Sequence, residues 1–251
     1  MRYRIAQLSD LHLTTSRRKK AWRWPVWANL ERALDRVAQE GPFDRIILTG
    51  DLASVRKPET YSRLREALAP FWDRVRVLPG NHDSRSLMAS TFSERLLDQG
   101  GWLSFVDVLP GLRLIGLDSL RPWRVSGKLG NAQRAWLAGE LEESEEPVLL
   151  FLHHPVLRIG CWWLDKDLLR DSDELKEMLR GSCVQALFFG HVHQEFSGEF
   201  AGLPAHATPS TAYQFRPHAI RPGATERGEP AFRIIELDER GRLETHVLME
   251  E

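Results

Sequence analysis

Short apolar runs and helical patterns alternate along this chain. The first six runs contain four to six residues each, drawn largely from Val, Ile, Leu and Phe. Continuous runs of this kind are typical of strands that are buried on both faces. They predict strands at Arg4–Leu8, Arg45–Thr49, Arg74–Leu78, Leu112–Leu117, Val148–Leu152 and Val184–Phe189.

Between these runs, the apolar residues recur at helical spacing. The segment Val26–Gln39 places one stripe along a helix, formed by Val26, Leu30, Ala33, Leu34, Val37 and Ala38. Similar patterns predict helices at Glu59–Ala69, Ser84–Leu97, Asn131–Leu141 and Asp173–Leu179. From about residue 198 the pattern changes, and Gly and Pro turns separate strands predicted at Pro204–Thr208, Ala231–Leu237 and Arg242–Leu248.

This order of elements predicts an α/β fold that ends in a β-meander. About ten short strands fit two packed sheets with helices outside, and a single doubly wound sheet is the alternative. The length of 251 residues suits one large domain or two small ones. Because no linker or repeat interrupts the chain, we expect one domain over residues 1–251, with the meander of about 198–251 inside it.

Composition narrows the functional class. Lys and Arg number 34 and Asp and Glu 35, so we expect no nucleic-acid partner, although a local basic patch is compatible with this count. Two cysteines, Cys161 and Cys183, make no disulfide framework and indicate a reducing compartment. No segment reaches the ~20 apolar residues of a membrane span, and the first residues lack a signal-peptide pattern. We therefore expect a cytoplasmic protein that does not bind membranes.

Polar clusters follow five of the six apolar strands. They are Ser9-Asp10-Leu11-His12, Gly50-Asp51, Gly80-Asn81-His82-Asp83, His153-His154-Pro155 and Gly190-His191-Val192-His193. Each cluster alone has an ordinary structural explanation, such as a turn at Gly-Asp or a histidine in the core. Open α/β sheets place ligands at the carboxyl ends of their strands, so the five clusters together predict one site.

The donor groups in these clusters point to metal. Imidazole and carboxylate without thiolate suit manganese, iron, zinc or cobalt. Seven donors exceed what one ion takes, and they suit two ions that share a bridging carboxylate. The charge of two such ions outweighs that of two carboxylates and a hydroxide, so the site would attract an anion such as a phosphate ester.

Five short motifs resemble, in order and spacing, those of the calcineurin-like metallophosphoesterase superfamily. They are Asp-x-His, Gly-Asp, Gly-Asn-His-Asp, His-His-Pro and Gly-His-x-His. Further segments resemble the bacterial class III 3′,5′-cyclic-AMP phosphodiesterases, so that the likeness covers nearly the whole chain. These segments are Gly127-x-Leu129 with Gln133 and Trp136-Leu137, Gly160–Asp165, Gly190–Glu195, Ala207–Thr211 and Gln214–His218.

The resemblance implies a four-layer α/β/β/α sandwich of two mixed sheets, with a dimetal site at the carboxyl ends of the strands. It implies two metal ions, with iron and manganese expected before zinc and cobalt. The ligands implied for one ion are Asp10, His12, Asp51 and His193. Those implied for the other are Asp51, Asn81, His153 and His191. Asp51 would bridge the two ions, and His153 rather than His154 would be the ligand from its pair.

The same resemblance implies a reaction and the residues that touch the substrate. We expect hydrolysis of 3′,5′-cyclic AMP to 5′-AMP by a hydroxide that bridges the metals. The leaving oxygen needs a proton, and His82 is the predicted catalytic acid. Alternatively, His82 orients Asn81 or the phosphate. The predicted phosphate contacts are His12, Asp51, Asn81, His82 and His193.

One segment departs from the family pattern. After His12, the segment Thr14–Trp24 is basic and aromatic and contains Arg17-Arg18-Lys19-Lys20. We expect it to border the site. It could hold a nucleic-acid backbone and stack a base, or it could be a solvated charged loop.

Two other functions stay open. One is a phosphodiesterase for another diester: a glycerophosphodiester, a 2′,3′-cyclic nucleotide, a nucleotide pyrophosphate or nucleic acid. The other is a non-catalytic metallophosphoesterase scaffold that binds a protein, against which the complete donor set argues. We expect a small-molecule phosphodiester as substrate, a cyclic nucleotide in the first place, and a monomer or homodimer as the assembly.

Overall fold

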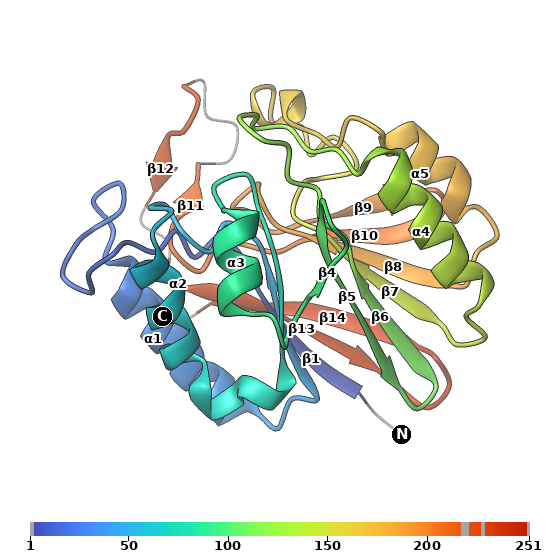
Figure 1. Cartoon of the computed structure of the whole chain (residues 1–251), viewed down its shortest axis with the longest axis horizontal. Helices are drawn as coiled ribbons and strands as arrows, with labels where there is room; N and C mark the ends of the chain where they lie inside the picture. Colours follow the sequence, from blue (N-terminus) through green and yellow to red (C-terminus); the bar gives the residue numbers. More distant parts are fainter. Residues whose placement is uncertain (1–2, 217–220, 227–228, 250–251) are drawn as a thin grey trace.

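The computed structural model describes residues 3–216, 221–226 and 229–249. Two sheets pack face to face, and helices cover the outer face of each sheet (Figure 1). This arrangement confirms the predicted α/β/β/α sandwich and excludes the single doubly wound sheet.

The first sheet has five strands in the order β14-β13-β1-β2-β3. They are β1 (Tyr3–Leu8), β2 (Arg45–Thr49), β3 (Val75–Leu78), β13 (Ala231–Leu237) and β14 (Leu243–Met249). The three N-terminal strands are parallel to one another, whereas β13 is antiparallel to β1 and to β14. The sheet is therefore mixed.

The second sheet has seven strands in the order β4-β5-β6-β7-β8-β10-β9. They are β4 (Leu97–Asp98), β5 (Leu103–Leu109), β6 (Leu112–Gly116), β7 (Val148–Phe151), β8 (Val184–Phe189), β9 (Phe196–Phe200) and β10 (Leu203–Ala207). Parallel strands form its centre, and antiparallel partners flank them. A separate two-stranded ribbon contains β11 (Gln214–Phe215) and β12 (Thr225–Glu226).

The helices divide between the two outer faces. Those that contribute to the core of the first sheet are α1 (Val26–Glu40), α2 (Pro58–Ala67) and α3 (Arg85–Thr91). Those that cover the second sheet are α4 (Gly130–Glu142) and α5 (Ser172–Leu179). Two 3₁₀ turns, η1 (Ala69–Arg74) and η2 (Leu164–Lys166), complete the set of helical segments in the described ranges.

Three hydrophobic clusters fill the spaces between the four layers. Successive residues of one strand supply different clusters. Ile5 and Ile47 pack between the two sheets, whereas Leu8 and Ile46 pack against the helices. Because both faces of these strands are buried, their sequences read as continuous apolar runs.

All six strands predicted from those runs are present, with bounds that shift by one residue at most. The sequence did not predict β5, which lies at the side of the second sheet. Its pattern is interrupted by Asp107, which forms ion pairs with Arg45 and Arg76 of the first sheet, the latter at 2.8 Å. These charges connect the two sheets at their edge, and they mask the strand character of the segment.

The helix predicted over Ser84–Leu97 is wrong in its second half. Helix α3 ends at Thr91, and the chain then turns toward β4. Phe92 is fully buried and packs on the rings of Tyr61 and Trp72. The apolar residues that resembled a helical stripe therefore enter the core through a turn. Similarly, α2 ends at Ala67 rather than Ala69, shortly before Pro70, a residue type that disfavours helical backbone ahead of it.

The C-terminal strands join the same sheet as the N-terminal strand. Tyr3 of β1 pairs with Leu237 of β13, and Gln7 pairs with Arg233. This pairing supports our proposal that residues 1–251 form one domain. In the described ranges no helix combines the length and apolar character needed to cross a bilayer.

Gly116 sets how closely the two sheets approach. A Cβ at this position would lie 2.3 Å from Cε1 of Phe105 and 2.8 Å from Cδ2 of Leu78 in the facing sheet. We expect Gly116→Ala to lower the free energy of unfolding by about 1–3 kcal/mol, because the core cannot accommodate the methyl group without shifting. Urea denaturation measures this change. The control is Gly139→Ala in α4, where the Cβ meets nothing within 4 Å and should stabilise by about 0.5–1 kcal/mol. Equal stability of wild type and Gly116→Ala would contradict this account.

Candidate metal centre

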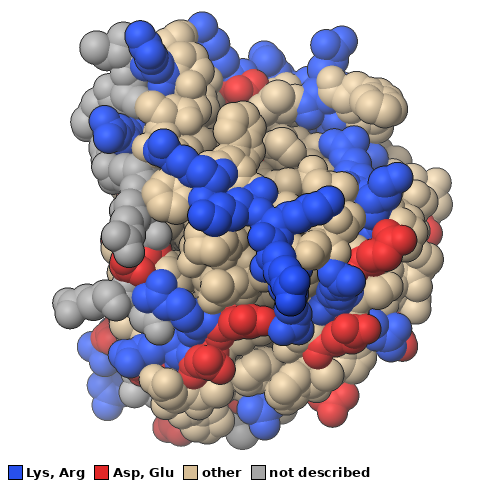
Figure 2. Space-filling view, turned by 90° about the vertical axis from the view of Figure 1, so that its left-hand side faces the viewer, with Lys and Arg blue, Asp and Glu red and all other residues tan. Residues whose placement is uncertain are grey.

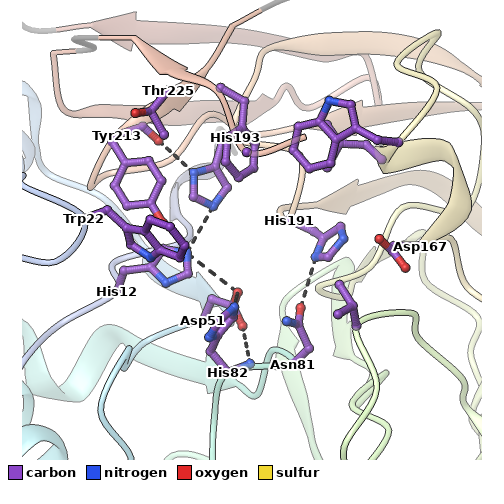
Figure 3. A pocket seen from close by; sticks show the side chains of 15 residues that line it. His12, Trp22, Asp51, Asn81, His82, Asp167, His191, His193, Tyr213 and Thr225 are labelled. Atoms are coloured by element: carbon purple, nitrogen blue, oxygen red, sulfur yellow. Dashed lines mark hydrogen bonds and ion pairs between the residues drawn. The ribbon is translucent and has the colours of Figure 1, made fainter. Parts of the chain in front are cut away.

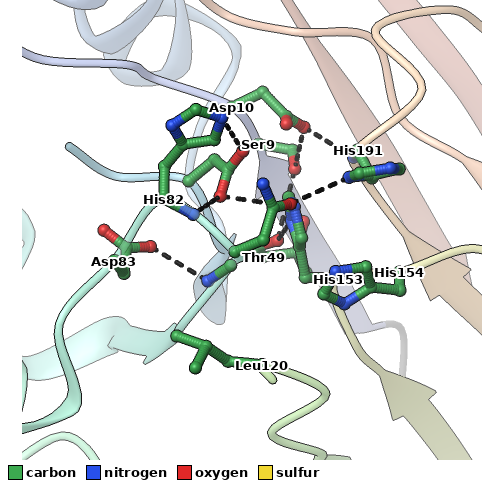
Figure 4. A network of polar contacts seen from close by, with 12 residues as sticks. Ser9, Asp10, Thr49, His82, Asp83, Leu120, His153, His154 and His191 are labelled. Atoms are coloured by element: carbon green, nitrogen blue, oxygen red, sulfur yellow. Dashed lines mark hydrogen bonds and ion pairs between the residues drawn. The ribbon is translucent and has the colours of Figure 1, made fainter. Parts of the chain in front are cut away.

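The five predicted clusters meet at the carboxyl ends of β1, β2, β3, β7 and β8 (Figure 4). All seven residues predicted as metal ligands lie in one buried group, with none of them more than 9% exposed. His82, the predicted acid, lies at the edge of the group, and its side chain is 44% exposed. The structure thus brings every predicted site residue together.

The backbone at these positions is unusual. Nine non-glycine residues in the described ranges have a positive φ, and five of them are Asp10, His12, Asp51, His191 and His193. A positive φ is uncommon outside glycine, and it persists where the surrounding structure enforces it, frequently at functional sites. The strands therefore end in a conformation that turns these side chains toward a common centre.

Glycines let the strand ends approach one another. A Cβ on Gly80 would lie 2.2 Å from Oδ1 of Asp51, and one on Gly190 would lie 1.9 Å from Oγ of Ser9. Side chains at these two positions would displace Asp51 and the Ser9–Asp10 segment. The glycines of the Gly-Asn-His-Asp and Gly-His-x-His motifs are thus required by close packing.

Four donor atoms form a first group. Nε2 of His193 lies 3.2 Å from Oδ1 of Asp10 and 3.1 Å from Nε2 of His12. Nε2 of His12 lies 3.7 Å from Oδ2 of Asp51 and 4.0 Å from Oδ1 of Asp10. Ligand bonds of about 2.0–2.2 Å place the donors of one ion about 3.0–4.2 Å apart, so this group has the spacing of a metal site.

A second donor group lies on the other side of Asp51. Nε2 of His153 lies 3.4 Å from Oδ1 of Asp51 and 3.2 Å from Oδ1 of Asn81. Nδ1 of His191 lies 3.1 Å from the same Asn81 oxygen. The two oxygens of Asp51 face different groups, Oδ2 the first and Oδ1 the second.

Hydrogen bonds at the outer nitrogens orient two of the histidines. Nδ1 of His193 donates to the carbonyl of Tyr213 at 2.7 Å, and Nδ1 of His153 donates to the carbonyl of Thr49 at 2.8 Å. A carbonyl can only accept, so in the neutral ring the proton is on Nδ1 and the lone pair of Nε2 points inward. Metal-binding histidines are commonly held in this way.

His154, the other member of the His-His pair, already has partners at both ring nitrogens. Nε2 donates to the carbonyl of Val125 at 2.8 Å, and Nδ1 lies 2.7 Å from Oγ of Ser119. Its ring therefore holds the segment around Val125 against the cluster. This geometry supports His153 as the ligand.

Burial and charge set the protonation of the cluster. Burial raises the pKa of Asp10 and Asp51, but the nearby histidines outweigh it and hold both values below the ordinary range. Burial lowers the pKa of His12 and His191 to about 3, so both rings are neutral. Burial also opposes the charge of His153, but Asp51 and Asp10 outweigh it and raise its pKa to about 9.

The cluster fits a bound cation. Within the described ranges, Oδ1 of Asp10 is buried without a hydrogen-bond partner. An unsatisfied buried polar atom is costly, and a cation beside it would remove that cost. The inward lone pairs and the spacing of the donors fit the same explanation.

Asp83 supports the two loops that carry Asp51 and Asn81. Its carboxylate accepts hydrogen bonds from the backbone of Leu52, Ala53 and Gly80. The hydroxyl of Tyr61 donates to it at 3.0 Å. Burial and the charge of Asp51 raise the pKa of Asp83 to about 6.

A pocket of about 580 Å³, including space open to solvent, lies over the cluster (Figure 3). All five predicted phosphate contacts line it. The sequence did not point to Trp163, Asp167, Tyr213 and Phe215, which also line it. Trp163 and Phe215 belong to the class III-like segments Gly160–Asp165 and Gln214–His218, and this resemblance was the one signal that could have found them. Asp167 and Tyr213 lie outside those segments. The end of the Gln214–His218 segment lies outside the described residues.

The basic segment borders this pocket as predicted, because Trp22 lines it. Arg17, Arg18, Lys19 and Lys20 are exposed. The segment is the blue loop at the left of Figure 1, and Figure 2 shows that side of the molecule, where Lys and Arg side chains gather in a band.

Comparison with known proteins agrees with this geometry. Residues 3–195 match the sequence model of the calcineurin-like phosphoesterase family. The chain belongs to this family. Its members work with a dimetal centre, and the His and Asp groups described above are of the kind that holds metal. The prediction of a calcineurin-like, metal-dependent phosphoesterase is confirmed.

Two relatives of this calcineurin-like phosphoesterase are named 3′,5′-cyclic adenosine monophosphate phosphodiesterase CpdA. The one from Escherichia coli strain K12 is 32% identical over 98% of this chain and 89% of its own length. The one from Pseudomonas aeruginosa is 34% identical over 97% of this chain and 88% of its own length. A dimetal phosphatase from Danio rerio shares the fold, with a TM-score of 0.67, 15% identity and 98% coverage of both chains.

The raised pKa of His153 makes metal binding depend on pH. In the metal-free protein this ring is protonated below about pH 9, and it must lose its proton to act as a ligand. We expect manganese to bind more tightly as the pH rises from 6 to 8, with a proton released per ion at the second group. Calorimetry in buffers of different ionisation enthalpy measures the release. His206→Gln, outside the cluster, should behave as wild type, and pH-independent binding would contradict the assignment.

Proposed function

We propose that this phosphoesterase hydrolyses 3′,5′-cyclic AMP to 5′-AMP. The observation that carries the proposal is the convergence of two donor groups on Asp51 at the floor of a pocket. The names of the relatives agree with this substrate. The similarity to these relatives covers nearly the whole chain at 32–34% identity. The intact donor set argues against a scaffold without catalytic activity.

Asp10, His12, Asp51 and His193 would hold one metal ion, and Asp51, Asn81, His153 and His191 would hold the other. Iron and manganese suit these oxygen and nitrogen donors, with zinc and cobalt as alternatives. Two bound ions would lower the pKa of a water molecule and neutralise charge on the phosphoryl oxygens. The protein's part is to fix the donors and to place the phosphate, for which His12, Asp51, Asn81, His82 and His193 line the pocket.

In this proposal, His82 would donate a proton to the leaving 3′ oxygen. Its Nε2 lies 4.0 Å from Oδ2 of Asp51, and its ring packs edge-on against His12. The backbone N–H of His82 donates to Oδ1 of Asp51 at 2.8 Å, and Arg56 donates to the carbonyls of Asn81 and His82. The backbone is therefore fixed, while the half-exposed ring faces the space that a substrate on Asp51 and Asn81 would fill.

The cytoplasmic location and the assembly as a monomer or homodimer stay predictions. The exposed Arg17–Lys20 segment does not require a nucleic-acid substrate, because a positive rim would equally attract a small anion.

Product analysis tests the proposed reaction. Purified protein loaded with manganese or iron is incubated with 3′,5′-cyclic AMP, and the products are separated by chromatography. We expect 5′-AMP as the end product, and we expect Asp51→Ala to abolish turnover because both donor groups lose an oxygen. Adenosine and free phosphate as the main products would identify a monoesterase instead. Turnover of 2′,3′-cyclic nucleotides or glycerophosphodiesters without turnover of cyclic AMP would identify another diester as the substrate.

The acid role of His82 predicts a dependence on the leaving group. General acid catalysis typically contributes about 10²–10⁴-fold, and only a poor leaving group needs it. We therefore expect His82→Ala to reduce kcat for cyclic AMP by about that factor and to affect a nitrophenyl diester far less. Rates on the two substrates are compared at one metal concentration. Equal losses on both would assign His82 to phosphate positioning.

A further inference from the structure

The pocket has an inner and an outer part with different chemistry. The inner part is formed by the polar donors, whereas aromatic side chains surround the outer part. Phe215 stacks on His193 with a centroid distance of 4.3 Å, and Trp163 packs edge-on against Phe215 at 4.9 Å. Trp22 lies across the opening from Asp167 (Figure 3). Phosphate chemistry at the inner part does not require these walls.

Trp22 is held in place by a strained turn. Ala21 and Trp24 exchange both backbone hydrogen bonds, at 3.1 and 2.8 Å, so Trp22 and Arg23 occupy the tip. Both tip residues have a positive φ, of 49° and 79°, where glycine or asparagine is the usual choice. Such backbone costs about 1–3 kcal/mol per residue and is often found where function requires it. The indole gains little from burial in return, because it is 69% exposed.

The base of the turn is anchored to the core. Ala21 is buried, and the hydroxyl of Thr14 donates to the carbonyls of Ser16 and Lys19 at 3.0 and 3.1 Å. The indole of Trp27 donates to the carbonyl of Thr14 at 2.8 Å. The exposed ring of Trp22 is thus presented at the pocket opening from a fixed segment.

Asp167 adds a hydrogen-bond acceptor across the opening from Trp22 (Figure 3). Within the described ranges, its carboxylate makes no hydrogen bond and no close ion pair. Burial raises the pKa of this carboxyl, and the charges of Arg170 and Lys166 oppose the rise. Its negative charge would repel a second phosphate group, whereas an amino group could donate to it. The outer part therefore suits a flat, uncharged group that carries hydrogen-bond donors.

We propose that the outer part of the pocket is a nucleobase subsite, in which Trp22 stacks on the base and Asp167 accepts a hydrogen bond from its amino group. This inference rests on the proposed function and specifies how the substrate is selected. It favours cyclic nucleotides with an amino-substituted base over nucleotide pyrophosphates, which carry a second phosphate. Trp22 and Asp167 are specificity-determining residues in this account, and neither takes part in the chemistry.

The first test compares cyclic AMP with its base-free analogue, 1-deoxyribose 3,5-cyclic phosphate. Trp22→Asn removes the indole and keeps a residue that tolerates positive φ. The matched control is Trp123→Asn, because Trp123 is also exposed, has a φ of 63° and does not line the pocket. Stacking of a base on an aromatic ring is worth about 5- to 150-fold in affinity. We expect Trp22→Asn to reduce the preference for cyclic AMP in kcat/KM by about that factor, mainly through KM, and Trp123→Asn to retain it.

Two further measurements separate a loss of base stacking from a loss of folding as the cause of a reduced preference. The difference in affinity between 5′-AMP and ribose 5-phosphate, measured by calorimetry, should become smaller in Trp22→Asn. The melting temperature of this variant should not fall, because a strained position is relieved. An unchanged preference for cyclic AMP, or equal losses on both substrates, would overturn the stacking role. If wild type turns over neither substrate but cleaves another diester, then the proposed function fails before the subsite is tested.

The second test addresses Asp167. Purine riboside 3′,5′-cyclic phosphate lacks only the amino group of cyclic AMP. We expect wild type to prefer cyclic AMP by roughly 10-fold, the contribution of a hydrogen bond to a charged group, and Asp167→Ala to lose this preference. Asp167→Asn, which keeps an acceptor oxygen, should retain part of it. A preference that survives Asp167→Ala would remove this residue from the subsite.

Discussion

The catalytic region depends on a backbone constraint at the ends of the strands. Five donor residues have a left-handed backbone within four residues of the end of a buried strand, and the glycines beside them allow neighbouring loops to touch. Each such residue costs about 1–3 kcal/mol, and the two packed sheets with three apolar clusters supply the rigidity that enforces it. The fold thus acts as a frame whose stability maintains an unfavourable local conformation. Side chains from residues 10 to 193 meet because their strands end at the same level.

The buried charges of the cluster compensate one another even without metal. Two carboxylates in a buried site would be strongly destabilising if they had no positive partner. A protonated His153 supplies one positive charge beside Asp51 and Asp10. His12 and His191 stay neutral because burial disfavours their charged forms. The cluster therefore retains excess negative charge, which favours cations, while the proton on His153 limits its cost to folding.

Much of this fold was predictable because buried parallel strands have continuous apolar runs in their sequence. The six apolar runs and the residues directly after them identified the strands, the donor set and the pocket floor. The pattern of apolar residues does not predict the correct element where a charge or a turn interrupts it, as at Asp107 in β5 and at Phe92 after α3. The aromatic wall was hidden for another reason. Trp163, just before η2, and Phe215, in β11, are far apart in the sequence. Burial patterns show that a residue is packed but do not show which residue it packs against.

The pairing of β1 with β13 has a consequence for biosynthesis. β1 is synthesised well before β13, the strand that covers its outer edge and ends at Leu237. At about 5–20 residues per second, the ribosome needs roughly 10–50 s to reach that point. Until then the nascent chain carries an apolar strand with one row of unpaired backbone groups, a template for association with other chains. A strand translated later therefore protects an earlier one, and the cell must keep the growing chain apart from its neighbours in the interval.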